Sequence, residues 1–191
     1  FEYNGTAMDP RQPFIAAAFQ PFGTQHLAVL AVIAAACALV FRVAGQASRS
    51  ARLLFGRVLG CVLLAYAVCL YVQQAHAGFL AWEYSLPLEL CNLVLIACLA
   101  SLFWPNRFTT EIAYFWGLGG VLQATVTPDL GLGFPSRDFL LFFWGHGATL
   151  LAIAFLVSAP EFTPRRNSVL RMMAALNAYA LLAGGINALA G

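Results

Sequence analysis

Six long apolar stretches dominate this chain, and short polar segments separate them. A helix needs about 20 predominantly apolar residues to cross the hydrocarbon core of a bilayer. Inside that core each backbone N–H and C=O must be hydrogen-bonded within the protein, which a helix achieves by itself. The chain is therefore predicted to be an all-α protein, a polytopic membrane helical bundle of about six transmembrane helices. The predicted spans cover residues 26–43, 53–72, 87–103, 112–127, 139–157 and 169–189.

Composition supports this fold class and excludes others. Of the 191 residues, 61% are hydrophobic and 9% are charged, whereas a soluble domain carries about 25% charged residues. The basic residues are all arginines that lie between the apolar stretches without forming a basic stripe, so nucleic acid is not an expected partner. The five cysteines fall inside apolar runs without a CxxC pair, which favours neither a disulfide framework nor a metal site. No cofactor is predicted.

Residues 14–191 are expected to form a single transmembrane domain. Residues 1–13 are expected to be an N-terminal tail, and its first residues a remnant that is not native to the protein. Residues 14–22 are expected to form a short interfacial helix, and Trp82 and Tyr84 to mark an interface, as amphipathic rings do.

Arginine distribution predicts the orientation, because cytoplasmic loops of membrane proteins are rich in basic residues. With the N-terminus outside, only Arg11 and Arg137 lie on the outer side, and the remaining eight of the ten arginines lie inside. The reverse topology would place those eight outside. The N-terminus is therefore predicted to face outward.

Polar residues gather at the outer ends of the predicted spans, whereas the inner halves are almost purely aliphatic and aromatic. Polar groups inside a membrane protein tend to pair with one another or to line a hydrated cavity. The location of these polar residues on one side of the membrane predicts an outward-facing polar pocket. The alternative is that they are polar only because residues near any helix end contact water. The predicted pocket residues are Glu89, Cys91, Asn92, His26, Gln123, Thr127, His146 and Asn187.

Residues 86–93 (Leu-Pro-Leu-Glu-Leu-Cys-Asn-Leu) place a carboxylate, a thiol and an amide at the start of the third span. If the helix begins at the proline, Glu89 and Asn92 share a face while Cys91 points to its edge. An irregular first turn would let Cys91 face inward instead. A Cys91–His146 pair would be a nucleophile and its base, and a Glu89–His146 pair would be an acid/base couple or a structural ion pair. The remaining alternatives are a packed core cysteine and a histidine bonded to a neighbouring helix.

Four segments of the chain resemble the YwaF family of bacterial integral membrane proteins. They are residues 22–26 (Phe-Gly-Thr-Gln-His), 86–93, 116–128 (with Trp-Gly-Leu-Gly-Gly and Thr-Pro) and 144–147 (Trp-Gly-His-Gly). This family is similar to eukaryotic transmembrane protein 164, described as an acyltransferase that moves a fatty acyl chain onto lysophospholipids through a cysteine in a Pro-x-x-x-Cys context. The resemblance implies that Cys91 carries the acyl group and that His146 is its base. It also implies a multi-pass protein of the cell inner (cytoplasmic) membrane.

The predicted function is that of an integral membrane protein with an outward-facing polar pocket, acting as a lipid acyltransferase through a cysteine thioester. Asn92 or Gln123 would stabilise the oxyanion, and the substrate would be a membrane lipid. The alternative, from another class, is a membrane subunit that binds or translocates a small solute without catalysis, alone or with a partner subunit. A third possibility is a structural role without chemistry.

Overall fold

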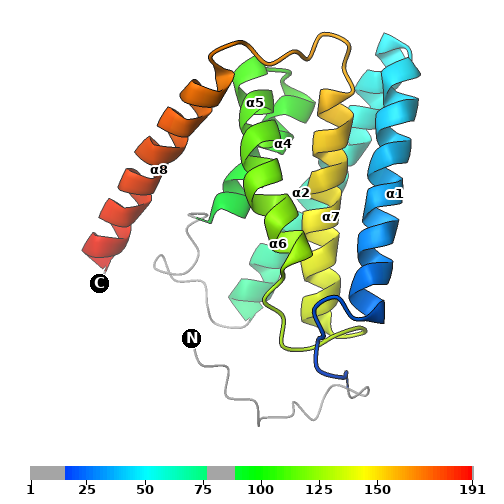
Figure 1. The fold of residues 1–191 in the computed structure, drawn as a ribbon, viewed down its shortest axis with the longest axis vertical. Helices are drawn as coiled ribbons and strands as arrows, with labels where there is room; N and C mark the ends of the chain where they lie inside the picture. The colour runs from blue at the N-terminus through cyan, green and yellow to red at the C-terminus, as the bar shows by residue number, and fades with distance from the viewer. Residues whose placement is uncertain (1–15, 77–88, 191) are drawn as a thin grey trace.

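The predicted spans correspond to helices in the computed structural model, which describes residues 16–76 and 89–190. Four of them are long and apolar enough to cross a membrane: α1 (Thr24–Gln46), α2 (Arg49–His76), α7 (Arg137–Val157) and α8 (Ser168–Ala190). The others are the shorter α4 (Leu90–Phe103) and a rod made of α5 (Arg107–Trp116), the π-helical turn η1 (Gly117–Val121) and α6 (Leu122–Val126). The described residues thus confirm the predicted all-α membrane bundle (Figure 1).

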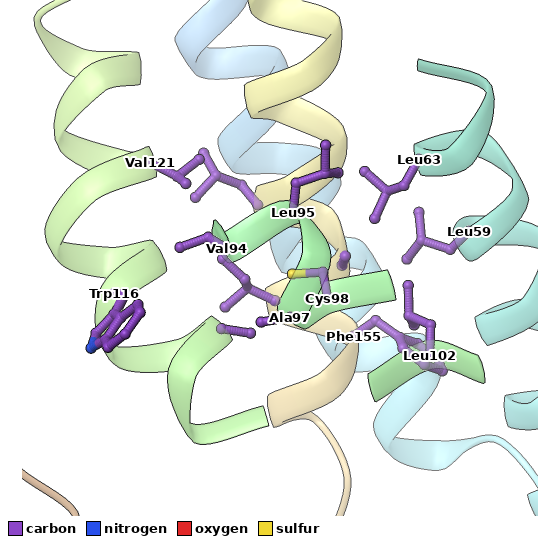
Figure 2. Close-up of a cluster of buried hydrophobic side chains, with 14 of the residues drawn as sticks. Leu59, Leu63, Val94, Leu95, Ala97, Cys98, Leu102, Trp116, Val121 and Phe155 are labelled. Carbon is purple, nitrogen blue, oxygen red and sulfur yellow. The ribbon is translucent and has the colours of Figure 1, made fainter. Parts of the chain in front are cut away.

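The short helix α4 lies at the centre of the bundle, in contact with α2, α5, η1 and α7. It is apolar on all sides rather than on one face, which is typical of a helix that is buried all round. Its Val94 and Cys98 are fully buried, and Figure 2 shows them among side chains that include Leu63, Trp116 and Phe155. Cys98 therefore packs as a small core hydrophobe.

Helix α7 lies between α1 on one side and the α5–η1–α6 rod on the other, while α8 leans away from the bundle (Figure 1). The contact between α8 and the rod lies near the start of α8, where Ser168 and Met172 are buried. There Trp116 Nε1 donates a hydrogen bond to the Met172 carbonyl at 3.2 Å. Farther along α8, large apolar side chains such as Leu181 and Leu182 are exposed, as suits a helix that faces lipid.

The interfacial helix predicted over residues 14–22 is wrong where the structure describes it, from residue 16 onward. Ala18 instead forms an isolated antiparallel bridge with Leu132, and backbone hydrogen bonds of 3.0 and 2.8 Å flank this bridge. The loop between α6 and α7 thus satisfies the polar backbone of the segment, and local sequence does not reveal such a distant partner. Trp82 and Tyr84 lie outside the described residues.

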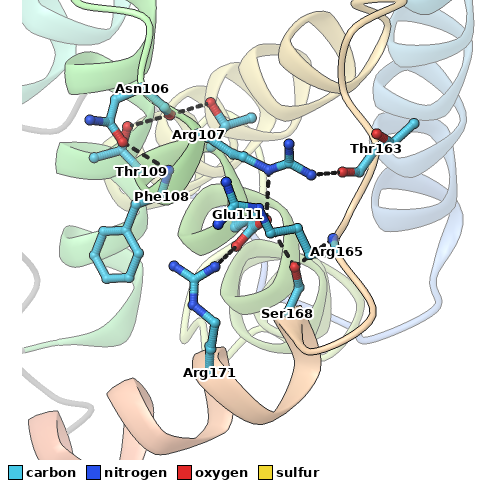
Figure 3. A network of polar contacts seen from close by, with 10 residues as sticks. Asn106, Arg107, Phe108, Thr109, Glu111, Thr163, Arg165, Ser168 and Arg171 are labelled. Atoms are coloured by element: carbon cyan, nitrogen blue, oxygen red, sulfur yellow. Dashed lines mark hydrogen bonds and ion pairs between the residues drawn. The ribbon is translucent and has the colours of Figure 1, made fainter.

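At the end of the bundle where α5 begins, Glu111 is fully buried and anchors a polar network (Figure 3). Its Oε1 accepts hydrogen bonds from Ser168 Oγ at 2.8 Å and from Arg107 Nε at 3.3 Å. Its Oε2 lies 3.6 Å from Arg171 Nη1, and Arg107 also donates to the Thr163 carbonyl. A buried charge is tolerated where partners and hydrogen bonds satisfy it. The network therefore ties the α7–α8 loop and the start of α8 to α5.

A third arginine, Arg52 of α2, closes the same end of the bundle. It donates to Ser158 Oγ at 3.0 Å, to the Phe155 carbonyl at 3.4 Å and to the Ala44 carbonyl. Carbonyls at helix C-termini lack intrahelical partners and carry partial negative charge. One cation thus caps the last turns of α1 and α7 together.

Candidate functional site

A cavity of about 610 Å³ lies at the opposite end of the bundle, where α2 ends and where α4 and α7 begin. Side chains from α2, α4, the η1–α6 segment and α7 line it. No arginine is among the described residues that line the cavity, so its fixed charges come from carboxylates. The polar lining includes Tyr66, Gln73, Gln74, Glu89, Cys91, Asn92, Thr127, Asp138 and His146.

Cys91 lies in the first turn of α4 and lines this cavity. Glu89 precedes the helix with an extended backbone (φ −80°, ψ 142°), so α4 begins at Leu90. Pro87, where both predicted geometries began the helix, lies outside the described residues. Glu89, Cys91 and Asn92 all line the cavity. The N-terminus of a helix favours a thiolate, whereas the partial burial of the thiol and the Glu89 carboxylate two residues before Cys91 oppose it.

His146 lies on α7, and its Nδ1 is 3.0 Å from the carbonyl oxygen of Phe142, one turn earlier. A carbonyl only accepts hydrogen bonds, so Nδ1 carries the proton and Nε2 is the basic nitrogen. The imidazole also stacks on the Phe142 ring, with centroids 4.0 Å apart and 19° between the planes. No group in the described part of the chain hydrogen-bonds to Nε2, which leaves this nitrogen able to accept a proton.

Cys91 and His146 line the same cavity, but no hydrogen bond joins the thiol to the imidazole among the residues the structure describes. Glu89 and His146, both described, do not form the ion pair that was the alternative. Catalytic hydrogen bonds are often long before substrate binds and tighten in the loaded enzyme. Both pairings therefore stay predictions about the loaded site.

The cavity is rich in hydrogen-bond acceptors that have no donor. The Oε1 atoms of Gln73 and Gln74 are buried without a partner in the described structure, and the carboxylates of Glu89 and Asp138 belong to the same lining. A buried acceptor without a donor costs about 1–3 kcal/mol. These oxygens therefore favour a ligand that brings donors such as hydroxyl groups. Within the described ranges, no group of three His, Cys, Asp or Glu side chains is placed to hold a metal ion.

Gly145, next to His146, lies against the ring of Tyr66, which also lines the cavity. A Cβ at position 145 would lie 2.6 Å from Tyr66 Cε1 and closer still to the end of the ring, so this approach of α2 to α7 requires glycine. The flanking glycines of His146 predict the close approach of a helix or a ligand. For Gly145 the neighbour is helix α2. Tyr66 itself gave no signal in the sequence, because an aromatic residue inside an apolar span looks like any core residue.

Three predicted site residues lie outside the lining, and two of them, Gln123 and Asn187, are exposed. Gln123 is exposed, and its amide donates to Thr127 Oγ1 at 3.0 Å, while Thr127 itself lines the cavity. Asn187 is exposed near the end of α8.

His26, also predicted as a site residue, is fully buried and does not belong to the lining. Its Nδ1 accepts the Phe22 N–H at 2.9 Å, and its Nε2 lies 3.1 Å from the Thr125 carbonyl. Because Nδ1 accepts, the proton lies on Nε2, which donates to that carbonyl. Three phenylalanine rings surround the imidazole, with centroids 5.3 to 5.8 Å away. In this position His26 joins the first turn of α1 to the end of α6.

The sequence profile of the TMEM164 family matches residues 21–191, which is nearly the whole chain. Neither a curated protein nor a solved structure matches the chain.

Proposed function

The chain belongs to the TMEM164 family, and from this premise we propose that it is a membrane-lipid acyltransferase that carries the acyl group on Cys91. One observation carries the proposal. A thiol at a helix N-terminus and an imidazole with an unbonded basic nitrogen line one cavity. The resemblance stated from the sequence implies the same two roles for Cys91 and His146.

In the first step His146 Nε2 takes the proton of the Cys91 thiol, and the thiolate attacks an ester carbonyl of a phospholipid. The ester C–O bond breaks and the acyl group stays on sulfur as a thioester. The imidazolium gives its proton to the leaving alkoxide, which departs as a lysophospholipid hydroxyl. The N-terminus of α4 favours the attacking thiolate and the Glu89 carboxylate opposes it, so the step depends on proton transfer to His146.

In the second step the hydroxyl of another lysophospholipid enters the cavity. His146 takes its proton while the oxygen attacks the thioester carbonyl. The C–S bond breaks, the new ester leaves, and the thiolate recovers its proton from the imidazolium. The unpartnered oxygens of Gln73 and Gln74 support this substrate class, since they can accept hydrogen bonds from glycerol hydroxyls.

Each tetrahedral intermediate needs a donor for its oxyanion, a contact worth about 3 kcal/mol when it is well placed. Asn92 is the better of the two predicted donors. It lines the cavity one residue from Cys91, whereas the Gln123 amide bonds to Thr127. The cavity opens at the end away from the arginine networks, so the substrate would come from the outer leaflet of the cytoplasmic membrane under the predicted orientation.

The test uses the purified chain in phospholipid vesicles supplied with a lysophospholipid, and follows the new phospholipid by mass spectrometry. Cys91→Ala should abolish both transfer and a hydroxylamine-sensitive acyl adduct on the intact protein. His146→Gln should lower the rate roughly 10²- to 10⁴-fold, as loss of a general base does. Cys61→Ala is the matched control, because this exposed cysteine of α2 is not in the lining. Full transfer by Cys91→Ala would overturn the mechanism.

A solute-binding role without catalysis is the second candidate, and the two unpartnered glutamine oxygens favour it. Such a protein would bind a small polar solute, with or without a partner subunit, and form no acyl adduct. Cys91→Ala would then leave solute binding unchanged, whereas a Gln73→Leu, Gln74→Leu double variant would weaken it.

A further inference from the structure

A second concave surface, of about 600 Å³, lies on the lipid-facing side of the bundle. We call it the α1–α6 groove: α1 forms one wall, the α5–η1–α6 rod forms the other, and α7 forms the floor, in the arrangement that Figure 1 shows. Its lining is almost entirely apolar, with side chains such as Leu30, Leu122 and Ile153. Arg42, at the end of the groove near the arginine networks, is the one charged side chain among the described residues that line it.

The length of the groove suits an acyl chain that enters from one leaflet of a membrane. On α1 its lining runs from Leu30 to Arg42, which is about 18 Å along the axis of an α-helix. Half of the hydrocarbon core of a bilayer is about 15 Å thick. On the rod the lining continues to Thr125 and Val126, at the level of His26 in the first turn of α1. The groove therefore runs from the arginine-side surface past the middle of the membrane, with its cationic end at the surface.

Small side chains on α1 leave open space along its wall of the groove. Ala34 and Ala38, one turn apart and so on one face of α1, line the groove and are exposed. No described side chain fills the space between them and Leu118 or Leu122 on the opposite wall.

Arg42 takes no part in the polar networks at this end of the bundle. Arg52, Arg107 and Arg171 are engaged with carbonyls or with Glu111, whereas Arg42 makes no hydrogen bond or ion pair to any described residue and is exposed. Guanidinium groups recognise phosphate through paired N–H donors.

We propose that the α1–α6 groove binds one acyl chain of a phospholipid from the arginine-side leaflet, with the lipid phosphate on Arg42. The occupant is a lipid because the groove is apolar along one leaflet and cationic where a headgroup phosphate lies. This site is distinct from the cavity that holds Cys91. The groove uses Leu150, Ile153 and Val157 from the second half of α7, whereas the cavity uses Phe142 and His146 from the first half.

The test incubates the full chain in vesicles that contain a phosphatidylglycerol with a photoactivatable diazirine on one acyl chain. After irradiation, mass spectrometry of peptides should find the adducts concentrated on the groove segments of α1 and α6. Ala38→Trp fills the groove and should lower the yield roughly tenfold. Ala35→Trp is the matched control, because Ala35 is equally exposed on α1 but lies outside the lining.

The headgroup contact is tested separately, with a variant that adds no bulk. Arg42→Gln should weaken binding roughly tenfold, as the loss of one charge-assisted hydrogen bond does, while Arg49→Gln, exposed and outside the groove, should not. Cys91→Ala should keep the groove adduct, so failure of the acyltransferase proposal and failure of this one are distinguishable. Adducts scattered evenly over the lipid-facing helices, or cross-links to a second copy of the chain in the groove, would overturn the proposal.

Discussion

At the scale of single residues, Gly145 sets how closely α2 and α7 approach beside the cavity. Gly145→Ala would place a methyl group where it overlaps the ring of Tyr66. A rigid aromatic ring cannot move aside as a flexible side chain can. We expect a loss of about 1–3 kcal/mol in the free energy of unfolding, the usual cost of overpacking. Thermal unfolding of the purified protein in detergent measures this loss.

The control for this prediction is Gly184→Ala on α8, where an added Cβ meets nothing within 4 Å. This variant should unfold at the wild-type temperature or slightly above it, because alanine favours a helix over glycine. Equal behaviour of the two variants would show that the Tyr66 contact does not limit the packing of α2 on α7.

The individual site residues also show what a sequence can and cannot predict about a site. Cys91 stood out because of the polar residues beside it and the family resemblance, and His146 because an imidazole is rare inside an apolar span; both line one cavity. His26 stood out for the same reason, yet it bonds to Phe22 and to the carbonyl of Thr125. Nothing local distinguishes the two histidines, since the difference lies in which distant backbone groups each one meets. The unpartnered oxygens of Gln73 and Gln74 likewise depend on tertiary neighbours.

At the scale of helices, the apolar length of each span predicted its existence and type but not its ends. The fourth span illustrates the limit. Hydropathy placed it at residues 112–127, but the helix begins at Arg107, because the Asn106 side chain accepts the Phe108 N–H at 2.8 Å and caps it. The π-helical turn within this rod, Gly117–Val121, has no hydropathy signal at all. It lies where the rod packs on α4 and α7, so tertiary contacts select it.

The network around Glu111 is the main polar link between α8 and the rod, and it gives a prediction at this scale. Glu111→Gln removes the charge that Arg107 and Arg171 share and keeps the side-chain shape. The two arginine side chains are 42% and 36% exposed, so water screens part of the loss. We expect about 1–3 kcal/mol less stability, the range for hydrogen bonds to charged groups and unsatisfied partners. Thermal unfolding at low salt measures it.

Glu161→Gln is the matched control, since Glu161 is exposed in the loop between α7 and α8. It should leave the unfolding temperature within error of the wild type. Because α8 meets the rod mainly near this network, Glu111→Gln should also speed proteolysis in the α7–α8 loop. A Glu111→Gln protein as stable and as protease-resistant as Glu161→Gln would mean that apolar contacts at Met172 hold α8 in place without the network.

At the scale of the whole molecule, the two ends of the bundle have different chemistry. One end carries Glu111 and the arginines that cap helix C-termini, and the other carries a cavity whose fixed charges are carboxylates. Basic residues favour the cytoplasmic side of a membrane. The asymmetry predicted from the order of arginines along the chain thus coincides with an asymmetry in how the helices are held together. The arginine end is cross-linked by charged side chains, whereas contacts to neutral groups, such as that of His26 with the Thr125 carbonyl, link the cavity end.

This asymmetry predicts the orientation of the chain, which reporter fusions can measure. Alkaline phosphatase is active only outside the cytoplasm, so fusions after Gly133, in the loop before α7, and after Ala188, near the end of α8, should be active. Fusions after Ala47, between α1 and α2, and after Arg166, between α7 and α8, should be inactive, because these positions lie at the arginine end. The opposite pattern would place the cavity on the cytoplasmic side. Cys91 would then draw its acyl donors from the inner leaflet, and Arg42 would meet a phosphate of the outer leaflet.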